Sequence, residues 1–146
     1  MILETATALT CLTYALYFEG RSESNLGMLA IGQTILNRVE DTRFPNTVCS
    51  VVTDGQRYSW NDQMVKNKCA FSFYCDGKDE VIRDEDAFDW AESLSFFLLD
   101  GGMSIDVTEG STHYHATYIK QPYWAKDLTL TVCIDKHCFY RWEYSK

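Results

Sequence analysis

Three features of the sequence predict an α+β fold that contains disulfides. Apolar residues recur at helical spacing in several segments of the N-terminal two thirds of the chain, whereas residues from Thr112 onward alternate at strand spacing. The chain also has six cysteines in 146 residues, an even count that is typical of disulfide-containing proteins. Helices followed by strands are the order of an α+β domain, and the length predicts a single domain over residues 1–146.

Two helices are predicted near the N-terminus, with a break between them. The first covers residues 5–18, and we expect Gly20 to end it, because glycine tolerates the left-handed conformation that terminates helices. The second covers residues 25–40 and is capped by Ser22 or Ser24. It is apolar on nearly every side, which predicts a buried position.

Gln33 and Asn37 are the polar exceptions in this second helix. They are four residues apart, so they share one face of the helix. A buried amide needs hydrogen-bond partners, and we expect both amides and their partners to lie at a functional cleft.

The middle of the chain contains one well-marked helix. Its acidic start at residues 84–86 suits the helix dipole, an apolar run follows, and a glycine pair at residues 101–102 ends it. Residues 47–53 form an apolar segment that fits either a helix or a strand. Residues 54–68 are polar and predict an irregular loop, whereas the aromatic segment 69–75 resembles a strand.

A β-hairpin is predicted close to the C-terminus. The segments TLTVCID and HCFYRWEY have strand character. With Asp135-Lys136 as a two-residue turn, Cys133 lies directly opposite Cys138. This register favours a disulfide between these two cysteines.

The other four cysteines allow one further local pairing. Cys69 and Cys75 flank a loop short enough to be closed by a disulfide. Cys11 and Cys49 then remain, either as a third pair or as two buried thiols. Zinc binding is the competing interpretation of the cysteines, but the chain has no C-x-x-C pair.

Charge and hydropathy exclude two classes of partner. The net charge is −8, from 13 basic and 21 acidic residues, which argues against binding to nucleic-acid phosphates. No segment approaches the roughly 18 apolar residues that cross a membrane, so we expect no membrane partner. The apolar N-terminus has no Lys or Arg and carries Glu4, so it predicts a core helix rather than a signal peptide.

The stretch YFEGRSES, at residues 17–24, carries two carboxylates at the break between the first two helices. Apolar surroundings from Tyr17 and Phe18 would raise the pKa of Glu19, and the end of a helix acts in the same direction. Such a neutral carboxyl is the general acid of glycoside cleavage. The alternative is an ordinary exposed glutamate at a helix end, and the local sequence leaves both open.

Glu23 is the second carboxylate of this stretch. Four-residue spacing would place it on the same helix face as Glu19 only if the helix were continuous, and Gly20 argues against continuity. We therefore expect Glu23 to favour the start of the second helix and to pair with Arg21.

The three histidines raise the possibility of a zinc site. His113 and His115 alternate in a predicted strand, so their side chains point the same way. His137 is the remaining histidine, and nothing in the spacing fixes it as a third ligand. We expect no metal and no other cofactor, and no Cys–His nucleophile, because paired cysteines are not thiolates.

Aromatic residues are frequent outside the predicted helices. They are interleaved with Ser72, Thr112, His115 and Gln121, a mixture that suits a sugar-binding groove as well as a core. The residues concerned are Tyr58, Trp60, Phe71, Phe73, Tyr74, Tyr114, Tyr118, Tyr123 and Trp124.

Five sequence blocks together resemble the SleB-type cell wall hydrolases, a branch of the lysozyme-like superfamily. They occur in the order found in that family and extend over residues 15–142. A single block would be weak evidence, but five in register are specific. The blocks are YFEGRSESNLGMLAIGQTILNRV, FPNTVCSVV, CAFSFYCDGK, GSTHYHATYIKQPYWA and IDKHCFYRW.

The resemblance implies a lysozyme-like domain with a helical core and a small antiparallel sheet. It also implies cleavage of peptidoglycan between N-acetylmuramic acid and N-acetylglucosamine, with Glu19 at the position of the family's catalytic glutamate. In a lytic transglycosylase one acid suffices. The substrate-binding residues that we expect are Phe71, Ser72, Tyr114, His115, Tyr118, Trp124, Gln33 and Asn37. Asp135 departs from the family pattern, which often has glycine before the histidine.

Two other functions stay open from the sequence. One is a metal-dependent amidase or peptidase that uses the three histidines, and the other is a non-catalytic wall-binding or virion protein. For the favoured function, the sequence does not choose between hydrolysis and transglycosylation. We expect a monomer that acts on glycan strands of peptidoglycan, in the periplasm or outside the cell, or after release from a phage-infected cell.

Overall fold

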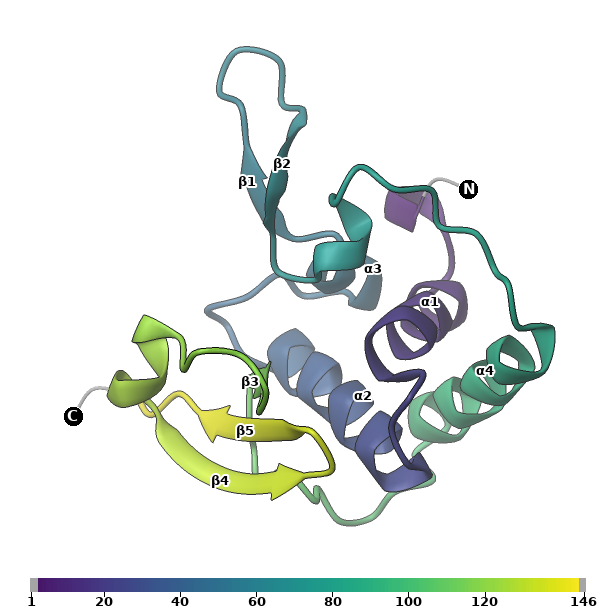
Figure 1. The fold of residues 1–146 in the computed structure, drawn as a ribbon, viewed down its shortest axis with the longest axis vertical. Helices are drawn as coiled ribbons and strands as arrows, with labels where there is room; N and C mark the ends of the chain where they lie inside the picture. The colour runs from purple at the N-terminus through teal and green to yellow at the C-terminus, as the bar shows by residue number, and fades with distance from the viewer. Residues whose placement is uncertain (1–2, 145–146) are drawn as a thin grey trace.

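The computed structural model describes residues 3–144. The α-helices lie together on one side of the molecule, and a three-stranded sheet lies on the other (Figure 1). Helix α1 packs against the other three α-helices, and its Leu12 and Leu16 are fully buried with Ile31 of α2 and Val51 of α3. No helix within residues 3–144 is long and apolar enough to cross a membrane. The helical elements are η1 Leu3–Thr5, α1 Ala8–Gly20, α2 Asn25–Glu40, α3 Val48–Val52, η2 Ser72–Tyr74, α4 Glu85–Leu99 and η3 Tyr123–Asp127.

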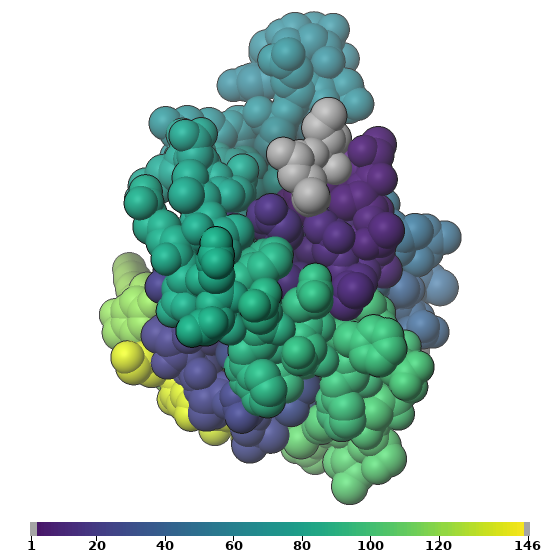
Figure 2. All heavy atoms as spheres, turned by 90° about the vertical axis from the view of Figure 1, so that its right-hand side faces the viewer, coloured from purple at the N-terminus to yellow at the C-terminus, as the bar shows by residue number. Residues whose placement is uncertain are grey.

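The strands form two antiparallel sheets. Strands β1 (Gly55–Arg57) and β2 (Met64–Cys69) make a hairpin that projects from the body of the molecule, at the top of Figures 1 and 2. Strands β3 (His113–Ala116), β4 (Thr129–Ile134) and β5 (His137–Arg141) form the second sheet in the order β3–β5–β4. The predicted hairpin near the C-terminus is therefore confirmed, with Cys133 paired opposite Cys138.

Helix α1 begins and ends later than expected. Thr7 caps its start by accepting a hydrogen bond from the Thr10 amide at 3.2 Å. The prediction that Gly20 ends the helix through a left-handed conformation is wrong, because Gly20 is itself helical and its φ is not positive. Gly20 is needed for packing instead. A Cβ there would lie 3.2 Å from side-chain atoms of both Met28 and Ile31, which belong to α2.

Helix α2 has the predicted bounds, and Ser24 is its cap. The Ser24 hydroxyl accepts a hydrogen bond from the Gly27 amide at 3.1 Å. It also donates to Asp135 Oδ2 at 2.5 Å, and the Ser24 amide donates to the same oxygen at 2.9 Å. Asp135 lies in the β4–β5 turn with a φ of 51°, a left-handed conformation that glycine adopts most readily. Its carboxylate thereby attaches the turn to the start of α2.

The segment between α3 and α4 differs most from the predictions. Residues 48–52 are helical, and the predicted loop at 54–68 contains the β1–β2 hairpin. Gly55 makes this pairing close, since a Cβ on it would lie 2.6 Å from the Cys69 Cα. The segment 69–75 is not a strand throughout: β2 ends at Cys69, and a 3₁₀ turn follows.

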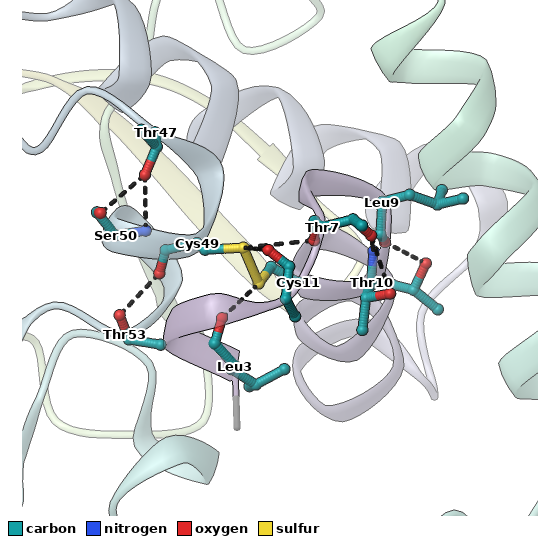
Figure 3. Close-up of a disulfide and its surroundings, with 11 residues drawn as sticks. Leu3, Thr7, Leu9, Thr10, Cys11, Thr47, Cys49, Ser50 and Thr53 are labelled. Atoms are coloured by element: carbon teal, nitrogen blue, oxygen red, sulfur yellow. Dashed lines mark hydrogen bonds between the residues drawn. A yellow bond between two sulfur atoms is a disulfide. The ribbon is translucent and has the colours of Figure 1, made fainter. Parts of the chain in front are cut away.

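Three disulfides connect these elements. Cys69–Cys75 and Cys133–Cys138 are present as the sequence favoured. Cys11 of α1 and Cys49 of α3 form the third, with Cα atoms 5.3 Å apart, which decides the alternative left open by the sequence. Figure 3 shows this disulfide beside Leu3 of η1, whose carbonyl oxygen lies 3.1 Å from the Cys11 sulfur.

We predict that the Cys11–Cys49 disulfide stabilises the fold more than Cys133–Cys138. Its cysteines are 38 residues apart, against 5 for the hairpin pair. Loop entropy then gives about 4 kcal/mol for the first and about 2 kcal/mol for the second. The test compares the free energies of unfolding in denaturant for the two variants in which both cysteines of a pair become Ala. A larger loss from the hairpin pair would contradict the prediction.

Candidate functional site

A cleft of ≈ 670 Å³ lies where the end of α1 faces the three-stranded sheet. This is the size of a typical ligand site. Its walls come from the α1–α2 junction, the β2–η2 link, β3 with the loop that follows it, and the β4–β5 turn. Seven of the predicted site residues line it, namely Glu19, Phe71, Ser72, Tyr114, His115, Tyr118 and Trp124.

Glu19 stands in the last turn of α1 and is half-buried in this cleft. Burial raises the pKa of its carboxyl from the ordinary 4.5 to about 7. Hydrogen bonds from the Tyr114 side chain and the Ser72 backbone act in the opposite direction, because they stabilise the carboxylate. Near neutral pH, the protonated and ionised forms of Glu19 are therefore both well populated.

Tyr114 places its hydroxyl at Glu19 from strand β3. Burial, and then the nearby Glu19 charge, hold the pKa of this hydroxyl well above its usual range. Tyr114 therefore remains a neutral hydrogen-bond donor. Its ring packs edge-on against His137, with centroids 5.1 Å apart, and lies 5.7 Å from the ring of Phe139.

Glu23 also lines the cleft, but in a different environment. Its Oε1 lies 2.9 Å from His137 Nδ1, and the side chains of Glu23 and His137 are only 4% and 11% exposed. Burial is the main cause that lowers the pKa of His137, and Glu23 opposes it. The expected pairing of Glu23 with Arg21 is wrong, since Arg21 lies 3.4 Å from Asp84 instead.

Arg38 is a site residue that the sequence analysis missed. It lines the cleft from α2, donates from Nε to the Thr112 carbonyl at 2.6 Å, and lies over the rings of Phe44 and Phe71. Burial lowers the pKa of its guanidinium. The sequence did contain one indication of this residue, because Arg38 is a cation within an otherwise apolar helix, one position beyond Asn37.

Gln33 and Asn37 do not line the cleft, contrary to the expectation. Gln33 donates to the Ile105 carbonyl at 2.9 Å and accepts from the Val107 amide at 3.0 Å. Asn37 donates to Asp106 Oδ2 at 2.8 Å. The two amides do share a face, but that face holds the loop before β3, whereas the next position, Arg38, reaches the cleft.

The three histidines do not form one cluster. Pairing of His115 with Cys138 and of Ala116 with His137 places His137 on the opposite face of the sheet from His113 and His115. His115 Nε2 is 2.9 Å from the Tyr140 hydroxyl. Burial is the main cause that lowers the pKa of His113 to about 4. Among residues 3–144, no group of three His, Cys, Asp or Glu side chains is arranged to hold a metal ion.

Comparison with solved structures identifies close likenesses to this fold. The catalytic domain of the germination-specific lytic transglycosylase SleB from Bacillus anthracis superposes with a TM-score of 0.68 at 25% identity, covering 92% of this chain and 93% of that one. The catalytic domain of Bacillus cereus SleB gives a TM-score of 0.62, also at 25% identity, covering 92% and 89%. The predicted lysozyme-like α+β fold is thereby confirmed.

Sequence comparison leads to the same group of proteins. A spore cortex-lytic enzyme of Bacillus cereus is 41% identical over 61 residues, which are 36% of this chain and 24% of the relative. The chain thus matches about a quarter of the length of that enzyme. The family model described as Cell Wall Hydrolase matches residues 22–140, a span that begins just after Glu19. The predicted resemblance is confirmed, and the chain belongs to the cell wall hydrolase family.

Proposed function

We propose that this chain cleaves the glycan strands of peptidoglycan, with Glu19 as the general acid and base. The observation that supports this most directly is a carboxyl with a pKa of about 7 in the main cleft of a cell wall hydrolase. The SleB catalytic domain from Bacillus anthracis, of which this chain covers 93%, is named a lytic transglycosylase. We infer that this chain cuts the bond between N-acetylmuramic acid and N-acetylglucosamine.

The proposed reaction needs one acid. Protonated Glu19 gives its proton to the bridging oxygen as the glycosidic bond breaks, which leaves a Glu19 carboxylate beside a positively charged sugar ring. The carboxylate then removes the proton of the muramic acid 6-hydroxyl as that oxygen bonds to the anomeric carbon. The products are a 1,6-anhydro sugar, a free hydroxyl on the leaving sugar, and Glu19 restored to its acid form.

The neighbours of Glu19 suit both halves of this reaction. Burial keeps the acid form populated for the first proton transfer, while Tyr114 and the Ser72 backbone stabilise the carboxylate formed in between. A group with a pKa near the working pH is the best compromise between donating and accepting a proton.

The aromatic side chains of the cleft are proposed to hold the sugars. Tyr118 is 77% exposed and lines the cleft together with Trp124, whereas Phe71 is 2% exposed and lies under the Arg38 guanidinium, so it supports the wall of the cleft. Aromatic rings pack on the apolar faces of sugars, and the exposed Ser72 side chain, which also lines the cleft, offers a hydroxyl for hydrogen bonds to the sugar.

The proposed place of action is the cell wall. Three disulfides fit a chain that works in an oxidising compartment, such as the periplasm or the space outside the cell. Peptidoglycan is located there as well, so the covalent chemistry of the chain and its proposed substrate agree.

Substitution of Glu19 by Gln tests the proposed acid. We predict that Glu19→Gln lowers release of soluble fragments from purified peptidoglycan by about 10²- to 10⁴-fold, as expected for loss of a general acid. The variant should unfold no earlier than the wild type, because a neutral amide replaces a half-buried ionisable group. Mass analysis of the wild-type products then distinguishes the two reactions. Transglycosylation gives 1,6-anhydro ends, whereas hydrolysis gives reducing ends.

Other outcomes of this assay would favour the alternatives. Wild-type protein that binds the wall but releases no fragments would indicate a non-catalytic wall-binding protein. Activity that persists in Glu19→Gln but is lost on chelation would indicate a metal-dependent amidase or peptidase. Either result would overturn the proposed role of Glu19.

The pH dependence of kcat/KM tests the environment of Glu19. Because the protonated form starts the reaction, we predict that kcat/KM falls as the pH rises through about 7. Tyr114→Phe removes a hydrogen bond that lowers the pKa of Glu19, so the fall should move to higher pH. Tyr123→Phe, at a tyrosine that is 84% exposed and outside the cleft, serves as the matched control. If kcat/KM of Tyr114→Phe falls at the same pH as that of the wild type, the result would contradict this account.

A further inference from the structure

A second hollow of ≈ 510 Å³ lies beside the catalytic cleft, between the end of α1 and the segment that leads into α4. Phe18 lines both hollows, so it forms the partition between them. It precedes Glu19 directly, and its ring stacks on Phe73 at a centroid distance of 5.1 Å. The segment that leads into α4 lies on the surface in Figure 2, drawn in teal-green. The two hollows therefore share the Phe18 side chain as a wall.

The second hollow is basic, although the protein as a whole carries a net charge of −8. Its walls include Arg21, Lys78 and Arg83 but only one acidic side chain, Asp79. The Arg21 charge is partly neutralised by Asp84 at 3.4 Å. Within residues 3–144, the side chains of Lys78 and Arg83 make no ion pair, so they are available to an anionic ligand.

The basic wall is attached to the helix that carries Glu19. The Tyr17 hydroxyl accepts hydrogen bonds from the backbone amides of Arg83 and Asp84, both at 3.1 Å. Tyr17 is 1% exposed, and the Arg21 guanidinium lies 5.1 Å from the centre of its ring. These contacts fix the distance between the basic hollow and the proposed catalytic acid, and such preformed geometry lowers the entropic cost of binding.

We propose that this basic hollow binds the acidic peptide that peptidoglycan carries on its muramic acid residues. The proposal rests on the proposed function, because it names a further part of the same substrate. The peptide branches from the sugar next to the cleaved bond, and its free carboxylates complement Lys78 and Arg83. Val81, which is 46% exposed, adds an apolar wall that suits the methyl groups of alanine residues. Two unpaired cations are too few for a polyphosphate chain, which requires many phosphate contacts.

Binding measurements with a catalytically silent protein test this proposal. The Glu19→Gln chain is titrated with a muropeptide fragment whose peptide carries free carboxylates, and with the same fragment after amidation of those carboxylates. We expect roughly 3- to 10-fold tighter binding of the acidic fragment, the effect of two partly exposed ion pairs. Raising the salt concentration should reduce this preference.

Two further variants decide the result. Adding Lys78→Ala and Arg83→Ala to Glu19→Gln should abolish the preference for the acidic fragment while binding of the amidated fragment stays within about twofold. Adding Lys68→Ala and Lys126→Ala instead should leave the preference unchanged, because these exposed lysines line neither hollow. Equal binding of both fragments, or a preference that survives loss of Lys78 and Arg83, would overturn the proposal. Since binding is measured without turnover, an inactive wild type with an intact preference would overturn only the proposed reaction.

Discussion

The contact between the α1–α2 junction and the β4–β5 turn determines the geometry of the whole cleft. Glu23 binds His137 at 2.9 Å, and Asp135 accepts two hydrogen bonds from Ser24. Strand β5, which follows this turn, pairs with β3, and β3 carries Tyr114. The distance from the Tyr114 hydroxyl to Glu19 therefore depends on polar contacts made by neither residue. Residues that hold such a constellation commonly matter as much as those that react.

Two carboxylates four residues apart, Glu19 and Glu23, lie in different surroundings. Glu19 receives hydrogen bonds from the Tyr114 side chain and the Ser72 backbone, and burial raises its pKa to about 7. Glu23 is in contact with an imidazole and accepts a weak hydrogen bond from the Lys136 amide at 3.4 Å. In enzymes that cleave glycosides, environments that separate two acids in this way also separate their functions. Under the proposed function, these contacts assign Glu23 to holding the β4–β5 turn in place, and the interruption between the two helices had already argued against a joint role with Glu19.

Local rules predicted the parts of the fold whose determinants are close in sequence. The cap at Ser24, the bounds of α2, the hairpin turn at Asp135 and the short-range disulfides all depend on neighbouring residues. The β1–β2 hairpin was missed because β1 is exposed along its length and shows no alternation of polar and apolar residues. The role of Gly20 was also missed, since close packing against α2 resembles a helix stop when only the sequence is read.

The candidate site, like the fold, could be predicted from the sequence only in part. Glu19 and the aromatic residues around it were found through the family resemblance, whereas spacing alone could not decide whether the acid was buried. Gln33 and Asn37 were correctly expected to need partners, but no local rule tells a buried amide whether its partner is a substrate or a loop. Arg38 was overlooked because its desolvated position depends on Phe44, Phe71 and β3 together.

The Cys69–Cys75 disulfide closes the short loop that carries Ser72, whose backbone binds Glu19. This covalent closure forms after translation, and only where thiols are oxidised. Where the two thiols stay reduced, this loop would not be closed, although it carries Ser72, one of the two hydrogen-bond donors to Glu19. Oxidation of this one pair of thiols therefore completes the surroundings of Glu19, and reducing conditions would leave them incomplete.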